Sequence, residues 1–586
     1  MKKTKIVCTI GPASESEELL EKLVQEGMNV CRLNFSHGSY KEHHDRIECI
    51  KKVRERLGVN LAIALDTKGP EIRLGKFEED KRISLAPSDH FTLTSRDILG
   101  NEKEVSISYK NLPKEVKIGS KILIDDGLVE LKVLSIENDE DIHCVVLNFG
   151  ELSNRKGLNL PTTDIQIPFL SEVDKADLIF GIEEEVDFIF ASFVRRAQDV
   201  LAIRKILEDH GGGDIQILAK IESKLGLKNI REILEVADGI MVARGDLGVE
   251  IPTEQVPLAQ KELIRQANYL GKPVIIATQM LDSMIRNPRA TRAEVNDVAN
   301  GILDGADAIM LSGETAAGKY PVEAVRQMRL ICEITEESKD FQESVKLRKK
   351  WMESNASSAI AQAVCGISEN LDLAAIVTAT ASGFTARQVS RYRPLVPIIA
   401  PTSSEKVYRL LSLIWGVYPV IAQVSVTTDE LIERSIFSAL KSKLVAQGDS
   451  IVLTAGIPVG EGTSTNLVKI HTIGEILSSG IGIVSGSVTG RACVGSSKEE
   501  LEEIFQDGDI LVCDFSSAEI LYFMERSLAM VVEEGGLTSH AAIVGQHFGK
   551  PTIIGAVDAL RKIKTGDIIT VDASSGLVYA GRAKVL

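Results

Sequence analysis

The chain has 586 residues, of which 44% are hydrophobic and 26% are charged, and its formal net charge at pH 7 is -16. This length predicts three to five domains, and the acidic balance argues against nucleic acid or an anionic membrane surface as a partner. A membrane span needs about 18 consecutive apolar residues, and no stretch of the sequence comes near this length. The N-terminus also lacks the apolar core of a signal peptide, so we expect a cytoplasmic protein.

Eight short apolar runs recur in the N-terminal half, with amphipathic segments between most neighbours. The runs are short and rich in β-branched residues, which favours strands over helices. Strands that alternate with helices indicate a parallel sheet covered on both faces. Eight such units favour an α/β fold with a closed (β/α)8 barrel, and an open doubly wound sheet is the alternative. The predicted strands are 4–10, 28–35, 61–67, 187–193, 215–222, 239–246, 273–280 and 307–314.

The gap between the third and fourth strands is too long for one crossover. Residues 71–167 show short alternating strands separated by Gly, Pro and Asp, which predicts an all-β lid inserted at the active-site face of the barrel. The barrel would therefore consist of residues 1–70 and 168–340. Residues 341–473 have the pattern of a smaller α/β domain, and residues 474–586 open with a Gly/Ser-rich stretch and form an extra domain.

Polar residues stand where the predicted barrel strands end, and these ends carry the catalytic groups of a barrel. A single one could be a solvated rim residue, but charged and amide groups converging on one mouth favour chemistry. Glu222 and Asp246 suit an oxygen-ligated cation such as Mg²⁺, and Arg32 and Lys220 suit a phosphoryl group, which together indicate phosphoryl transfer. The strand-end residues are Arg32, Asn34, Ser36, Asp66, Thr67, Lys220, Glu222, Arg244, Gly245, Asp246, Thr278, Gln279, Ser312 and Glu314.

Around these residues the sequence resembles the pyruvate kinase family. The matching motifs include CRLNFSHG (31–38), LDTKGPEIR (65–73), ILAKIES (217–223), MVARGDLGVE (241–250), VIIATQMLDSM (274–284) and NPRATRAEVNDVANGILDGADAIMLSGETAAGKYP (287–321). The resemblance implies transfer of the phosphoryl group of phosphoenolpyruvate to ADP, which gives pyruvate and ATP as the last step of glycolysis. It also implies a cytoplasmic homotetramer.

The same resemblance implies roles for the strand-end residues. Lys220 would neutralise charge on the transferring phosphoryl group and the forming enolate, Arg32 would also hold the phosphoryl group, and Thr278 would help to protonate the enolate carbon. The backbone from Ala243 through Arg244 to Gly245 would receive the substrate carboxylate. The implied ligands are Glu222 and Asp246 for Mg²⁺ or Mn²⁺; Asn34, Ser36, Asp66 and Thr67 for K⁺; and Arg73 and Lys156 for the nucleotide phosphates.

Glu71 is the residue that relates to whether the enzyme requires a monovalent cation. Family members with glutamate at this place tend to need K⁺, whereas those with lysine supply the positive charge themselves. We therefore expect K⁺ dependence.

A Ser/Thr/Gly turn precedes a predicted helix in TATASGFTARQVSRYRP (378–394). Its hydroxyls and N–H groups could hold a phosphate, or they could simply cap the helix. The resemblance implies an allosteric site for a sugar phosphate or a nucleotide, formed by Thr380, Ser382, Gly383 and Thr385. The Gly-rich loop 456–466 would receive the other end of that effector.

The extra domain contains GGLTSHAAIVGQHFGKPTIIG (535–555), which resembles the phosphohistidine domain of phosphoenolpyruvate-utilising enzymes. His540 matches the phosphorylated histidine by position, and a neutral imidazole can accept a phosphoryl group. A retained fold without this chemistry is the interpretation we favour. Two alternatives to the kinase remain: a phosphoenolpyruvate-dependent phosphotransferase working through phospho-His540, and a catalytically silent sensor.

Overall fold

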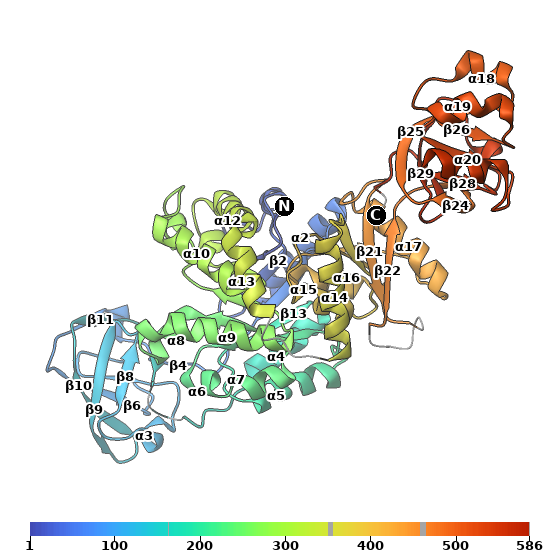
Figure 1. Ribbon diagram of the computed structural model, residues 1–586. Coiled ribbons are helices and arrows are strands. Elements are labelled where there is room, and N and C mark those ends of the chain that lie inside the picture. Colours follow the sequence, from blue (N-terminus) through green and yellow to red (C-terminus); the bar gives the residue numbers. More distant parts are fainter. Residues whose placement is uncertain (162, 164, 350–354, 458–464, 585–586) are drawn as a thin grey trace. The chain divides into compact units, whose positions relative to one another are not determined.

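A computed structural model describes the chain except for residues 162, 164, 350–354, 458–464 and 585–586 (Figure 1). It contains two compact units. The first comprises 1–355, 390–393 and 404–419, and the second comprises 356–389, 394–403 and 420–586. Over the described part of the chain, no helix is long and apolar enough to cross a membrane.

Eight parallel strands close into a barrel in the first unit, in the order β1-β17-β16-β15-β14-β13-β3-β2. This confirms the predicted barrel and excludes the open sheet. The strands are β1 (Lys5–Thr9), β2 (Val30–Asn34), β3 (Ala62–Asp66), β13 (Phe188–Ala191), β14 (Gln216–Ile221), β15 (Gly239–Ala243), β16 (Val274–Ala277) and β17 (Ala308–Leu311).

Helices surround the barrel, and local signals set where several of them begin and end. In α2 (Tyr40–Leu57), Ser39 and Glu42 form a capping box, and Gly58 ends the helix with φ 63°. In α10 (Arg292–Asp304), Thr291 and Glu294 form the same box. The other helices are α1 (Glu17–Gln25), α4 (Glu172–Glu183), α5 (Ala197–Asp209), α6 (Lys224–Lys228), α7 (Ile230–Val236), α9 (Val256–Leu270), α12 (Pro321–Glu337) and α13 (Lys339–Lys349).

The amino-terminal end of the barrel is filled. Leu410 and Leu413, from segment 404–419, pack with interior strand residues such as Phe190 and Met241. Arg409 Nε lies 2.8 Å from Asp187 Oδ1, just before β13. The opposite, carboxyl end is therefore the one available for a site.

The lid follows β3, and its regular structure consists mainly of β-strands. Seven strands pair in the order β4-β12-β8-β9-β10-β6-β7, and β11 pairs with β5. They enclose a separate apolar core. The elements are β4 (Ile72–Arg73), β5 (Ile83–Leu85), β6 (His90–Thr94), β7 (Glu104–Ser106), β8 (Lys121–Ile124), β9 (Val129–Glu137), β10 (Asp141–Val146), β11 (Gly150–Leu152), β12 (Gly157–Asn159) and the short helix α3 (Leu112–Glu115).

The second unit holds two sheets. In the first, β19 (Ile398–Thr402), β18 (Ala375–Thr378), β21 (Ser450–Ala455) and β22 (Leu467–Thr472) are neighbours in that order, together with helices α14 (Ala356–Asn370), α15 (Phe384–Ser390) and α17 (Thr428–Lys441). The second sheet has eight strands in the order β23-β30-β29-β25-β26-β27-β28-β24. These strands are β23 (Ile476–Ser479), β24 (Ile481–Val484), β25 (Ser487–Val494), β26 (Ile510–Cys513), β27 (Ala529–Val532), β28 (Thr552–Ile554), β29 (Ile568–Asp572) and β30 (Leu577–Ala580). The domain boundaries given above stay predictions.

Candidate active site

Arg32, Asp66 and Lys220 meet at the carboxyl end of the barrel. Arg32 lies on β2 and Asp66 on the neighbouring β3, and Lys220 lies on β14, which is separated from β3 by one strand. Arg32 Nε lies 2.6 Å from Asp66 Oδ2, and Lys220 Nζ lies 3.2 Å from Asp66 Oδ1. Asp66 is only 1% exposed. Burial would raise its pKa, but Arg32 and Lys220 outweigh that effect and hold the pKa of Asp66 below its ordinary value.

Lys220 is shared between two carboxylates. Its Nζ also lies 2.9 Å from Glu222 Oε1, as expected for two residues on one face of a strand. Burial disfavours the ammonium, but Asp66 and Glu222 outweigh burial and raise the pKa of Lys220. The lysine therefore stays charged at neutral pH.

Ser192 belongs to this network, although it is not among the site residues predicted from the sequence. It follows β13, where its hydroxyl accepts a hydrogen bond from Lys220 Nζ at 2.7 Å and donates one to the Thr67 carbonyl at 2.6 Å. Its position at the end of the fourth predicted strand is the signal that could have identified it.

Glu222 and Asp246 form a pair of carboxyl groups, of which Glu222 is buried and Asp246 is partly buried. Burial raises the pKa of Glu222 to about 7; Lys220 opposes that rise only in part, and Asp246 adds to it. Burial also raises the pKa of Asp246, and a hydrogen bond with Glu222 opposes the rise. Two neighbouring carboxyl groups form an oxygen donor set that suits a divalent cation.

Glu222 and Asp246 thus fit the predicted Mg²⁺ ligands. The described residues contain no group of three or more His, Cys, Asp or Glu that could hold a metal ion. Mg²⁺ commonly takes one or two carboxylates and completes its shell with water and substrate oxygens, so two protein ligands are sufficient.

The segment after β15 differs from the expected strand end. The strand stops at Ala243, and helix α8 (Arg244–Glu250) begins at once. The Arg244 guanidinium pairs with Asp297 Oδ2 at 2.7 Å and donates to the Thr278 carbonyl at 2.8 Å. Its side chain is therefore engaged in contacts between elements, while its backbone stays beside Gly245.

Thr278 faces the start of α8. The Gly245 N–H donates to Thr278 Oγ1 at 2.9 Å, and Thr278 Oγ1 donates to the Ala277 carbonyl at 2.6 Å. This brings the two predicted substrate-binding segments, which follow β15 and β16, into direct contact.

The predicted K⁺ ligands lie at or just after the ends of two paired strands, β2 and β3. Asn34 and Asp66 are register partners in β2 and β3, the Ser36 N–H donates to Asn34 Oδ1 at 3.2 Å, and Thr67 follows Asp66 directly. Amide, carbonyl, hydroxyl and carboxylate oxygens suit a hard monovalent cation, so the chemistry of this donor set fits the expectation.

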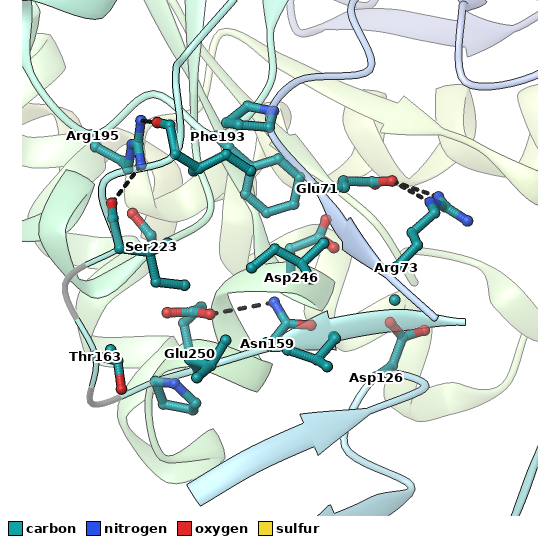
Figure 2. Close-up of a pocket in the computed structure, with 18 of the residues that line it drawn as sticks. Glu71, Arg73, Asp126, Asn159, Thr163, Phe193, Arg195, Ser223, Asp246 and Glu250 are labelled. Atoms are coloured by element: carbon teal, nitrogen blue, oxygen red, sulfur yellow. Dashed lines mark hydrogen bonds and ion pairs between the residues drawn. The ribbon is translucent and has the colours of Figure 1, made fainter. Parts of the chain in front are cut away.

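A cavity of about 580 Å³ lies between the barrel and the lid (Figure 2). Asp246 lines it from the barrel, and Arg73 and Lys156 line it from the lid. Arg73 Nε donates to Glu71 Oε2 at 2.7 Å, and Lys156 Nζ lies 2.9 Å from Asp125 Oδ1. The two predicted nucleotide-binding cations thus border the same space as a predicted metal ligand.

In the second unit, the predicted effector turn precedes α15. The Gly383 N–H donates to Thr380 Oγ1 at 2.9 Å, so Thr380 shapes the turn. Thr385 Oγ1 lies 3.0 Å from Thr465 Oγ1, and Ser382 is exposed. Most of the second loop, 458–464, lies outside the described residues.

His540 begins helix α20 (His540–Phe548) and is exposed. Its Nδ1 lies 3.0 Å from Ser516 Oγ. The preceding residue, Ser539, accepts a hydrogen bond from the Ala542 N–H and caps the helix.

Three family models match separate parts of the chain. The barrel domain of pyruvate kinase matches residues 1–325, the alpha/beta domain of pyruvate kinase matches 358–471, and the mobile domain of PEP-utilising enzymes matches 505–576.

Curated relatives match the chain over its whole length. It is 51% identical over 586 residues to pyruvate kinase of Geobacillus stearothermophilus, and 49% and 50% identical over 587 residues to pyruvate kinases of Staphylococcus haemolyticus (strain JCSC1435) and Bacillus licheniformis. In each case, 100% of both chains is covered. The chain belongs to the pyruvate kinase family, and it is an enzyme of the kinase class of transferases.

Proposed function

We propose that this member of the pyruvate kinase family transfers the phosphoryl group of phosphoenolpyruvate to ADP at the carboxyl end of its barrel. The observation that carries the proposal is the buried network of Arg32, Asp66, Lys220 and Glu222, which stands beside Asp246 and Thr278. Positively charged side chains held rigidly by carboxylates are what phosphoryl transfer requires of a protein.

The reaction breaks the bond between phosphorus and the enol oxygen and forms one between phosphorus and a terminal oxygen of ADP. Arg32 and Lys220 hold the phosphoryl oxygens, and Asp66 orients both cations. Because the pKa of Lys220 is raised, its ammonium neutralises the enolate and does not act as a proton donor. The enolate carbon then gains a proton from water ordered by the Thr278 hydroxyl, which yields pyruvate and ATP.

The family generally uses Mg²⁺ and K⁺. The proposed Mg²⁺ ligands are Glu222 and Asp246, and the proposed K⁺ ligands are Asn34, Ser36, Asp66 and the Thr67 carbonyl. A divalent cation supplies Lewis-acid stabilisation of phosphate and carboxylate oxygens when it is bound. Ala243 to Gly245 would receive the substrate carboxylate through the backbone, and Arg73 and Lys156 would bind the nucleotide phosphates.

The test is a coupled assay with phosphoenolpyruvate, ADP, Mg²⁺ and K⁺. Lys220→Met should lower kcat by at least roughly 10²–10³-fold, since it removes a cation aimed at transition-state charge. Lys205→Met removes an exposed lysine on α5 and should leave kcat unchanged. Full turnover by Lys220→Met would exclude the proposed mechanism.

The proposal extends to regulation by a phosphorylated metabolite at Thr380, Ser382, Gly383 and Thr385. The short contact between Thr385 and Thr465 supports it, because it brings the turn close to the end of the second loop. A triple Ala variant of Thr380, Ser382 and Thr385 should lose the response of the substrate saturation curve to sugar phosphates and nucleotides. An unchanged response would refute this site.

A homotetramer in the cytoplasm is part of the same proposal, and it rests on the family resemblance. Light scattering after size-exclusion chromatography measures the assembly directly.

A second candidate function is phosphotransfer through phospho-His540. The exposure of this histidine and its contact with Ser516 favour it, because a fixed imidazole at the surface can accept a phosphoryl group.

A further inference from the structure

One hydrogen bond joins the lid to the helix that carries Asp246. Asn159 Nδ2, at the end of lid strand β12, donates to Glu250 Oε1, at the end of barrel helix α8, over 3.3 Å. Figure 2 shows this bond crossing the cavity between lid and barrel, and both residues line that cavity.

The bond lies close to two groups of the proposed site. Asp246 and Glu250 are four residues apart on α8, so they share one face of the helix. Lys156 directly precedes β12 (Gly157–Asn159). A shift of Asn159 relative to Glu250 therefore also changes the distance between the Lys156 segment and Asp246.

Glu250 is a carboxyl group that the proposed reaction does not use. Among the residues that the structure describes, Glu250 forms no ion pair, and it accepts a hydrogen bond from the Asn159 amide. Burial raises the pKa of Glu250, and the Asn159 hydrogen bond opposes the rise. Glu250 is partly buried. Removing a carboxyl group from water is costly unless it is hydrogen-bonded, so the contact with the lid stabilises Glu250 in this position.

We propose that Asn159 and Glu250 are positioning residues that couple lid closure over the nucleotide to the placement of Asp246. This inference rests on the proposed function. Neither residue needs to touch the reacting atoms. When the lid closes, the bond holds α8 and β12 together, so Lys156 and Asp246 reach the same nucleotide at once.

The test is a double-mutant cycle in the full chain, with Asn159→Ala, Glu250→Ala and the double variant. Each single change should raise the KM for ADP by about 3- to 10-fold, the range expected for one lost hydrogen bond, with little change in the KM for phosphoenolpyruvate. The double variant should match the single variants, because both remove the same contact.

Two controls separate coupling from a general structural defect. Glu250→Gln keeps an acceptor oxygen and should restore the KM for ADP to within about twofold of the wild type. Glu254→Ala removes an exposed acid four residues further on and should have no effect. The proposal would be overturned if the fold-increases in the KM for ADP of the two single variants multiply in the double variant. An unchanged KM for ADP in both single variants would also overturn it.

Limited proteolysis of the lid gives a readout independent of turnover. ADP with Mg²⁺ should protect the wild-type lid from cleavage and protect the Glu250→Ala lid less. Equal protection would contradict the coupling. A wild-type protein that fails to phosphorylate ADP in the coupled assay would refute the proposed function, and this inference with it. If the wild type is active but the effects of the two substitutions on the KM for ADP are independent, only the inference is refuted.

Discussion

Thr278 adopts a backbone conformation that β-branched residues rarely take. Its φ is +71°, and Gln279 follows at +53°. Such positions cost about 1–3 kcal/mol each and persist only when surrounding contacts hold them. Arg244 supplies one of those contacts through the Thr278 carbonyl, and the Gly245 N–H supplies another through the hydroxyl. The strain thus coincides with the residue proposed to order the proton-donating water.

Arg244→Lys tests whether this strain matters for catalysis. A lysine cannot bond to Asp297 and to the Thr278 carbonyl in the planar geometry of a guanidinium, so Thr278 should relax. We expect kcat to fall by about 10–100-fold with a smaller change in the KM for phosphoenolpyruvate. Exchange of pyruvate methyl protons with deuterated water isolates the proton-transfer step and should slow in parallel.

Arg286→Lys is the matched control, since the Arg286 side chain is 72% exposed. Exchange at the wild-type rate in Arg244→Lys would show that the left-handed backbone of Thr278 needs no support from Arg244.

At the scale of elements, the turn from β3 into the lid joins the proposed cation site to the cavity. Glu71 lies in this turn, pairs with Arg73, and contributes to raising the pKa of Asp246 after the larger effect of burial. Its negative charge therefore acts on the divalent site, and a positive charge in its place would act in the opposite direction.

Glu71→Lys should relieve the predicted requirement for K⁺. The wild type should lose most of its activity when K⁺ is replaced by a large organic cation. The fraction of activity that the variant keeps after the same replacement should be at least about tenfold larger, because its ammonium group supplies the missing charge. Glu78→Lys, at an exposed lid position, controls for the added charge. Full wild-type activity without any monovalent cation would contradict K⁺ dependence.

The eight strands could be predicted from the sequence because each is a short, β-branched run within a regular alternation with helices. Their ends could not. In GIMVARGD, the apolar pattern does not show that the chain turns into a helix at Arg244, whose partner Asp297 lies 53 residues away. Ser192 stands at the end of a predicted strand, but its bond to the Thr67 carbonyl spans 125 residues and could not be predicted. Contacts of such separation come from tertiary structure, which local periodicity does not encode.

At the scale of the whole molecule, the chain returns from the extra domain to the first sheet of the second unit. The Lys584 N–H donates to the Gly448 carbonyl at 2.5 Å, and Lys584 Nζ lies 2.7 Å from Asp372 Oδ2. Gly448 has φ +93°, and a Cβ there would lie 2.0 Å from the Arg582 carbonyl oxygen. The extra domain is thus joined to its neighbour both by the connection after β22 and by the chain's last described residues, which favours a structural role for it.

His540→Ala decides between that role and phosphotransfer. The barrel cavity and His540 belong to different compact units, and direct transfer to ADP needs no carrier, so kcat should stay within about twofold of the wild type. His547→Ala, on the same helix and also exposed, is the matched control.

If phospho-His540 carries the reaction, His540→Ala alone abolishes turnover. Incubation of the wild type with phosphoenolpyruvate then also adds an acid-labile phosphoryl group to His540, which mass spectrometry detects. Normal turnover together with an unmodified histidine would leave the barrel site as the place of phosphoryl transfer, because every group that the direct mechanism needs lies in the first unit.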